Sequence, residues 1–177
     1  MSDISGGETR QRPPRIVVGI DGSESSKAAL AWAVHQARTT GAPLQVLITW
    51  ELPTTYGWAA PLPDGLDFEA DARGVVNEAI EEVIGPESAS QLDLTVSIIE
   101  GHPAAVLLHE SKDAGLIVVG SRGHGAFAGM LLGSVGQHLA AHAACPVVII
   151  RDGKSTVAHV QRPNKPDFRR DGGLAQA

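Results

Sequence analysis

The feature that most constrains the fold is a regular alternation of short apolar runs with longer segments of helical spacing. The runs hold at most eight residues each and are rich in Val and Ile, which is typical of buried strands rather than helices. Five such runs occur, at residues 15–20, 44–50, 92–99, 116–120 and 146–151. Four segments with helical spacing separate them, at residues 25–40, 66–84, 103–113 and 131–143. The alternation therefore predicts five strands joined by four helices.

This order of elements predicts parallel strands, because strands of one sheet that are joined through helices run in the same direction. The runs IVV, LIVV and VVII are apolar without interruption, as expected of strands with both faces buried. We expect an α/β domain of three layers, a Rossmann-like sandwich in which helices cover both faces of a five-stranded parallel sheet. Such sheets bind ligands beyond the carboxyl ends of their strands, near the point where the strand order reverses.

The first helical segment carries its own start and stop signals. Its apolar side chains fall on one helical face and are Ala29, Leu30, Ala33, Val34 and Ala37. We expect Ser23, Ser25 or Ser26 to cap its N-terminus. Gly41 stands where a C-terminal stop is expected, and Pro103 predicts the first turn of a later helix.

Composition predicts one domain between two polar ends. We expect residues 1–14 to form a loose leader and residues 152–177 a flexible tail, because both are rich in Gly, Pro and charges and lack periodicity. The folded domain is then 15–151. From Ile16 to Ile150 the chain holds 5 cationic and 15 anionic residues, a net charge of −10 with histidines neutral. A fold this acidic repels a phosphate backbone, so we expect no nucleic acid as a partner of the domain.

Cysteine usage and hydropathy point to the cytoplasm. Cys145 is the single cysteine, so no internal disulfide forms. The N-terminus lacks the apolar stretch of a signal peptide, and no run of 18 apolar residues predicts a membrane span.

His138 and His142 stand one helical turn apart and close to Cys145, which is a spacing that zinc accepts. Because no acidic fourth ligand lies nearby, we expect no metal site there.

Small residues follow two of the predicted strands. Residues 19–23 follow the first run and residues 120–125 the fourth, while Gly133 and Ser134 stand near the start of the last helical segment, just before residues 135–143. Glycines at a strand end let backbone N–H groups approach an anion, and a helix N-terminus adds free N–H groups and a favourable dipole. Arg122 adds a charged donor. Together these features indicate a cradle for a phosphate chain. The alternative is that the glycines only form turns and Ser134 only caps a helix.

The segment VVGSRGHGAFAGMLLGSVGQHLAAHAACPVVIIR resembles the closing half of a universal stress protein of the ATP-binding branch. That branch carries the pattern G-x2-G-x9-G-[S/T], matched here by Gly120, Gly123, Gly133 and Ser134. The segment IVVGIDGSESSKAALAWAV is similar to the opening strand and helix of the family, with Asp21 at the position of its acidic residue. The resemblance extends over residues 15–151, which is nearly the whole predicted domain.

The resemblance implies a site for ATP with Mg²⁺, in a sheet like that of the adenine nucleotide alpha hydrolases. Asp21 would contact the ribose or a metal on the phosphates, and Gly19 and Ile20 would line the purine. Trp50 matches a position whose backbone faces adenine. The residues implied to hold ribose and phosphates are Gly120, Ser121, Arg122, Gly123, His124, Gly125, Gly133, Ser134 and Val135. The family is usually dimeric, and we expect a homodimer through the strand at 146–151, whose edge no later strand covers.

Three of these residues also have a purely structural explanation. Asp21 is suited to cap the first helix or to form an Asx turn, which is compatible with ligand contact. Trp50 is suited to the core as much as to direct contact by its ring. His124 is better explained as a solvated loop residue than as a base, because loops are normally exposed.

The expected function is a nucleotide-sensing regulator of the stress response that binds ATP with little or no hydrolysis. The chain has no G-x4-G-K-[S/T] pattern, which excludes a P-loop hydrolase. A slow ATPase and an interaction module with a vestigial pocket are the alternatives. A flavodoxin-like fold that holds a flavin phosphate is less favoured. The chain has only 3 Trp, 1 Tyr and 3 Phe, and its informative glycine cluster follows the fourth strand rather than the first.

Overall fold

The computed structural model describes residues 13–52, 66–123 and 132–151, and within them it has an α/β fold. One sheet holds five strands in the order β3-β2-β1-β4-β5, and all neighbouring pairs are parallel. The strands are β1 (Ile16–Ile20), β2 (Leu44–Trp50), β3 (Leu94–Glu100), β4 (Leu116–Gly120) and β5 (Val147–Ile150). The helices are α1 (Glu24–Thr40), α2 (Phe68–Val83), α3 (Pro86–Ala89), α4 (Pro103–Glu110) and α5 (Ser134–His142). The predicted fold class is confirmed.

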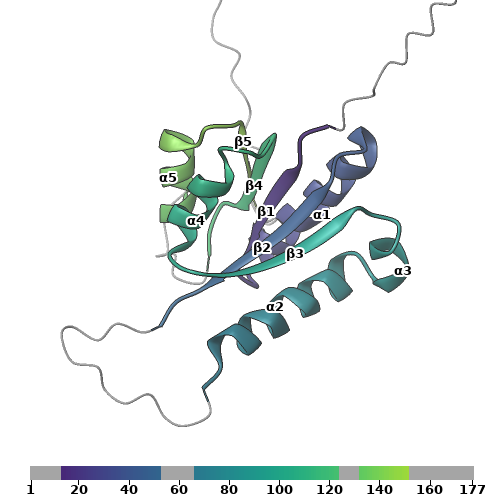
Figure 1. Cartoon of the computed structure of the whole chain (residues 1–177), viewed down its shortest axis with the longest axis horizontal. Coiled ribbons are helices and arrows are strands. Elements are labelled where there is room, and N and C mark those ends of the chain that lie inside the picture. The colour runs from purple at the N-terminus through teal and green to yellow at the C-terminus, as the bar shows by residue number, and fades with distance from the viewer. Residues whose placement is uncertain (1–12, 53–65, 124–131, 152–177) are drawn as a thin grey trace, which may run out of the picture.

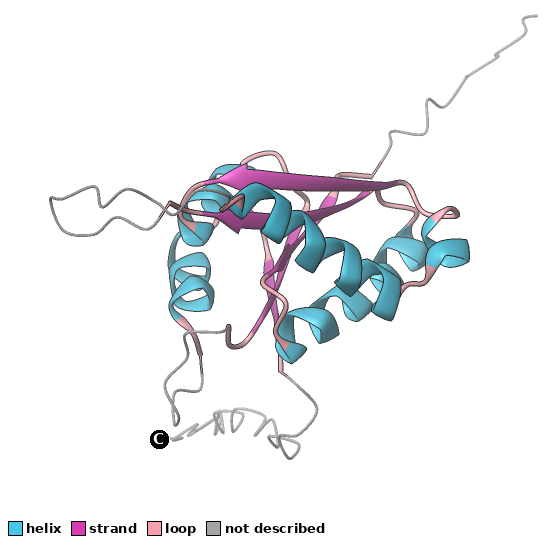
Figure 2. Ribbon diagram, turned by 90° about the horizontal axis from the view of Figure 1, so that it is seen from below, coloured by secondary structure: helices cyan, strands magenta, loops and turns pink. Residues whose placement is uncertain are grey.

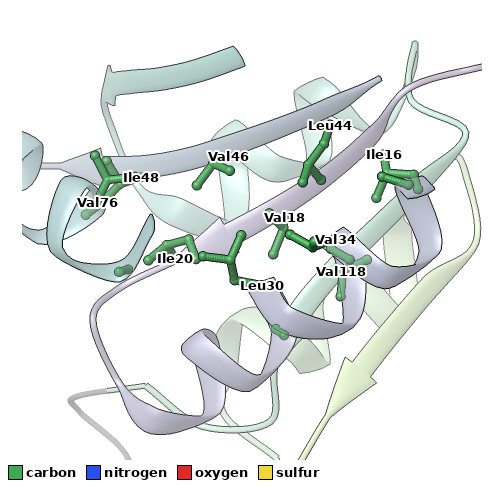
Figure 3. Close-up of a cluster of buried hydrophobic side chains, with 14 of the residues drawn as sticks. Ile16, Val18, Ile20, Leu30, Val34, Leu44, Val46, Ile48, Val76 and Val118 are labelled. Atoms are coloured by element: carbon green, nitrogen blue, oxygen red, sulfur yellow. The ribbon is translucent and has the colours of Figure 1, made fainter. Parts of the chain in front are cut away.

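The larger core lies between the sheet and the helices α1 and α2. Leu30 and Val34 of α1 and Val76 of α2 point toward alternate side chains of the central strands (Figure 3). The strand residues of this layer are Ile16, Val18, Ile20, Leu44, Val46, Ile48 and Val118. Each fully buried Leu, Ile or Val contributes about 1.5–3 kcal/mol relative to an exposed one, so this layer supplies much of the stability.

A second, smaller core covers the opposite face of the sheet. Figure 1 shows α4 and α5 together on the side away from α2, and Figure 2 shows helices on both sides of the strands. Leu107 of α4 and Leu139 of α5 pack there against the strand residues Val17, Leu47, Ile117 and Val119. The two cores use alternate residues of the same strands, because successive side chains of a strand point to opposite faces. The predicted three-layer arrangement is therefore present.

The helix boundaries follow from local chemistry. Ser23 is the N-cap of α1, and its hydroxyl oxygen accepts a hydrogen bond from the N–H group of Ser26 at 3.3 Å. Gly41 ends the helix in the left-handed conformation, with φ of 68°. Both signals were predicted. The sequence did not predict α3, because a helix of four residues is too short to show a helical period.

The chain order creates one special place at the carboxyl edge of the sheet. From β1 the chain goes to β2 and β3 on one side, and it then crosses to β4 and β5 on the other side. The carboxyl ends of β1 and β4 are therefore neighbours whose following segments diverge, which leaves room for a ligand between them.

Within the described ranges, no helix is long and apolar enough to cross a membrane. Most of the predicted leader and the whole predicted tail lie outside the described residues.

Candidate functional site

A cavity of about 570 Å³ opens at the carboxyl ends of β1, β2 and β4, beside the first residues of α4 and α5. Its lining consists of Gly19, Ile20, Asp21, Ser26, Leu47, Thr49, Glu51, Pro103, Leu107, Val119, Gly120, Ser121, Arg122, Gly123, Gly133, Ser134, Val135 and Gly136. The cavity lies where the strand order reverses, which is the usual ligand site of an open parallel sheet. Its volume falls within the range of small-molecule sites.

Most of the predicted site residues meet in this cavity. They are Gly19, Ile20, Asp21, Gly120, Ser121, Arg122, Gly123, Gly133, Ser134 and Val135. Trp50 is not among the lining residues. Its half-buried ring packs against the core beneath α1 and α2, and its carbonyl oxygen accepts a hydrogen bond from Gly101 N–H at 2.9 Å. His124 and Gly125 lie outside the described residues.

Asp21 is fixed by the residues that start α1. The Ser23 N–H group and the Ser23 hydroxyl both donate to Asp21 Oδ1, at 3.0 and 2.6 Å. This is an Asx turn, so the structural explanation of Asp21 holds, although Ser23 rather than Asp21 is the helix cap. Asp21 also lines the cavity and is exposed to solvent, so the turn leaves it available for a ligand.

The loop after β4 is clasped to the start of α1. The Ser25 hydroxyl donates a hydrogen bond to the carbonyl oxygen of Arg122, and the Ser23 hydroxyl lies 3.3 Å from the same oxygen. Gly120 makes this contact sterically possible. A Cβ atom at Gly120 would lie 2.7 Å from the Ser25 carbonyl carbon and 2.8 Å from the Ser26 nitrogen. At Gly123, a Cβ atom would collide with the Asp21 carboxylate. Gly120 therefore requires glycine because backbone atoms fill the space of a Cβ atom, whereas at Gly123 a Cβ atom would have to displace the exposed Asp21 carboxylate.

Helix α5 begins at the cavity without a side-chain cap. Its N-cap residue is Gly133, and Ser134 is its first helical residue, so the explanation that Ser134 serves only as a cap is wrong. The N–H groups of the first turn have no partner within the helix, and the dipole places partial positive charge there. The Gly133 N–H group donates to the Ser121 carbonyl at 2.8 Å, which holds this helix end against the loop after β4.

The side chains around the cavity do not form a positive patch. Among the described lining residues, Arg122 is the one cationic side chain, and Asp21 and Glu51 are the carboxylates. An anion bound here would therefore be held mainly by backbone N–H groups, the helix dipole and one guanidinium group. Such a site binds an anion whose oxygens reach these N–H groups, and it does not attract anions of every kind to the surface.

The model of the universal stress protein family matches residues 14–151, which is most of the chain. The chain belongs to the universal stress protein family. The universal stress protein Rv2623 of Mycobacterium tuberculosis is 34% identical over 138 residues, which cover 77% of this chain and 45% of the relative. Rv2624c of the same organism is 36% identical over 137 residues, with 77% and 47% covered. The chain thus spans about half the length of the curated relatives it matches.

Solved universal stress proteins share the fold. The universal stress protein UspA from Lactobacillus plantarum aligns with a TM-score of 0.64 at 23% identity, over 80% of this chain and 99% of that one. A universal stress protein solved in complex with cAMP aligns with a TM-score of 0.58 at 26% identity, over 79% of this chain and 98% of that one. The five-stranded parallel sheet is therefore the architecture that the family predicts.

Sequence reasoning missed the part of this universal stress protein site that β2 and α4 contribute. The cavity residues not predicted are Ser26, Leu47, Thr49, Glu51, Pro103, Leu107, Val119 and Gly136. For the residues of β2, the strand period of two was the signal in the sequence that could have identified them. It places Leu47, Thr49 and Glu51 on the cavity face and Trp50 on the other face. The ring of Trp50 therefore lies on the core face, as the structural explanation of this residue had it, and the expected approach of its backbone to a base stays a prediction.

The spacing of His138, His142 and Cys145, which zinc would accept, is not matched by a cluster of ligands among the described residues. Within the described ranges, no group of three His, Cys, Asp or Glu side chains could hold a metal ion. His138 Nδ1 lies 2.9 Å from the Ser134 carbonyl oxygen. Cys145 Sγ lies 3.5 Å from the carbonyl oxygen of Pro146, and burial raises the pKa of its thiol. A raised pKa lowers the fraction of thiolate, which is the form that binds metals.

We predict that Gly120→Ala lowers the free energy of unfolding by about 1–3 kcal/mol, because the new methyl group must displace the backbone of Ser25 and Ser26. Urea denaturation of both proteins measures this difference. Gly74→Ala in α2 is the matched control. Apart from the adjacent residues and the backbone of α2 itself, no described atom lies within 4 Å of the added methyl group, and Ala is the better helix former, so stability should rise by about 0.5–1 kcal/mol. Changes of the same sign in the two variants would contradict the packing role of Gly120.

Proposed function

We propose that this universal stress protein binds ATP with Mg²⁺ in the cavity and acts as a nucleotide-sensing regulator of the stress response, with little or no hydrolysis. The observation that carries the proposal is the meeting of a glycine-lined loop and an uncapped helix N-terminus in one cavity. Backbone N–H groups at such a place suit phosphate oxygens. The opposite wall, which includes Leu47 and Leu107, is apolar and suits a base.

The residues present fit the parts of a nucleotide. The first turn of α5, with the Ser134 hydroxyl, would hold the outer phosphates, and Arg122 would add a charge-assisted hydrogen bond. Asp21 would contact the ribose or the Mg²⁺ ion, since Oδ1 is already positioned by Ser23. When bound, the ion would neutralise part of the phosphate charge. This matters in a folded region that carries an excess of carboxylates.

The comparisons support a nucleotide as the ligand without distinguishing ATP from other nucleotides. A universal stress protein 26% identical to this chain over 79% of its length was solved in complex with cAMP. We infer that this chain likewise binds a nucleotide, and we propose ATP as that nucleotide. The proposed regulatory role applies to a chain that spans about half of its curated relatives.

Binding alone provides enough free energy for regulation. A ligand at 100 times its Kd stabilises the bound state by about 2.7 kcal/mol. That free energy shifts a conformational equilibrium only if the two states differ in affinity. The hydrogen bond from Ser25 to the Arg122 carbonyl links α1 to the proposed phosphate loop, so a change in that loop reaches α1 directly.

We predict that MgATP raises the melting temperature of the purified protein and that Arg122→Ala weakens ATP binding about tenfold or more, because a charge-assisted hydrogen bond is lost. Gly123→Val should also weaken binding, since its side chain displaces the Asp21 carboxylate from its position at the cavity. Arg38→Ala removes an equal charge from the last turn of α1 and should leave the affinity unchanged. If no ATP co-purifies with the protein and MgATP causes no thermal shift, the result would instead favour an interaction module with a vestigial pocket.

We predict that hydrolysis of ATP is far slower than the enzyme median of about 10 per second. Phosphoryl transfer needs a group that positions water near the outer phosphate. Of the two carboxylates among the described lining residues, Asp21 is assigned here to the ribose or the Mg²⁺ ion, and Glu51 follows β2, away from α5. Release of phosphate from MgATP measures the rate. A turnover number near the median would make the protein an ATPase.

We propose a homodimer that forms through the edge of β5. All four residues of β5 are half-buried, and β4 is its only neighbour among the described strands. The free edge presents unpaired backbone groups that favour pairing with another chain. Light scattering at micromolar concentration should therefore give twice the chain mass of 18.4 kDa. A monomeric mass at that concentration would refute the dimer.

A further inference from the structure

The two ends of the cavity differ in chemistry. One end is formed by the loop after β4 and the first turn of α5, where backbone N–H groups and Arg122 gather. The other end lies between β2 and α4, where Leu47, Pro103 and Leu107 form apolar walls. Neighbouring strands lie about 4.8 Å apart, so β2 is separated from β4 by about twice that distance, with β1 between them. A ligand that fills the cavity therefore presents its anionic part to α5 and its apolar part to β2.

Two polar side chains stand at the apolar end. Thr49 and Glu51 share the cavity face with Leu47, because they follow it at the strand period of two. Within the described part of the chain, neither side chain has a hydrogen-bond or ion-pair partner. Thr49 is half-buried and Glu51 is exposed, and both line the cavity, so within the described residues both can contact a ligand there. A carboxylate at the edge of an apolar site is an orienting group of the kind that fixes which ligand binds.

Building on the nucleotide site proposed above, we infer that Glu51 makes the cavity selective for a purine with an exocyclic amino group. An ionised carboxylate only accepts hydrogen bonds, so it requires a donor from the ligand. The amino group of adenine supplies N–H donors. A purine without that group offers no donor at that position, and the carbonyl oxygen of hypoxanthine would direct lone pairs at the carboxylate.

Thr49 does not produce the same selection. Its hydroxyl donates or accepts with equal ease, so it adapts to an amino group or a carbonyl oxygen. Glu51 is exposed, and water competes for its oxygens. The expected selection is therefore modest, about tenfold in affinity, which is the low end for a hydrogen bond to a charged group.

Competition binding with three Mg²⁺ complexes tests the inference: ATP, purine riboside 5′-triphosphate, which lacks only the amino group, and inosine 5′-triphosphate. The wild-type protein should bind ATP about tenfold more tightly than either analogue. In Glu51→Gln the difference should fall to about twofold, because the side-chain amide both donates and accepts. Glu100→Gln is the matched control. It removes an equal charge from an exposed residue at the end of β3 that does not line the cavity, so it should keep the tenfold preference.

The outcomes separate this inference from the proposed function. If the wild-type protein binds all three nucleotides equally, the inference is wrong and the nucleotide site stands. If the preference for ATP persists in Glu51→Gln, another group reads the base, and the inference is again wrong. If no triphosphate binds to the wild-type protein, both the proposed function and the inference fall. Loss of the preference in Glu51→Gln but not in Glu100→Gln supports the inference.

Discussion

The close contact between the start of α1 and the loop after β4 is the constraint on which the site depends. Gly120 has no side chain, so the backbone of Ser25 and Ser26 occupies the space that a Cβ atom would need. This approach lets the Ser25 hydroxyl reach the Arg122 carbonyl. It also brings the Asp21 carboxylate beside Gly123. The residues at the ends of β1 and β4 thus line one side of the cavity together, and residues of β2, α4 and α5 line the rest of it.

The division between what the sequence predicts and what it does not follows the range of the interactions. The strands β2 and β4 and the two ends of α1 were predicted correctly, because runs of Val and Ile, Ser23 and Gly41 act locally. The glycines of the loop after β4 were also predicted correctly as cavity residues, because their spacing is visible in the sequence. The contribution of β2 was not, because the choice between Trp50 and its neighbours depends on which face of the sheet each core covers. The role of α4 likewise depends on packing across the sheet.

The proposed anionic ligand would bind to a fold whose own net charge is negative. A positive surface would attract phosphates of every kind, including those of nucleic acids. Backbone N–H groups of α5 and a single guanidinium group act only over short range, inside a cavity of about 570 Å³. We expect the surrounding carboxylates to oppose nonspecific binding of polyanions while a small ligand could still reach those groups. Net charge and site chemistry therefore serve different purposes in this fold.

The parallel pairing of β1 with β4 has a consequence for biosynthesis. These strands are direct neighbours in the sheet, although most of the domain is encoded between them. A ribosome must therefore release β4 and α5, near the end of the domain, before the two halves of the cavity meet. Contacts between such distant segments also form slowly, because a long loop must close first. The proposed cavity ligand could therefore stabilise the finished domain but not the nascent chain, in which the two halves of its site have not yet met.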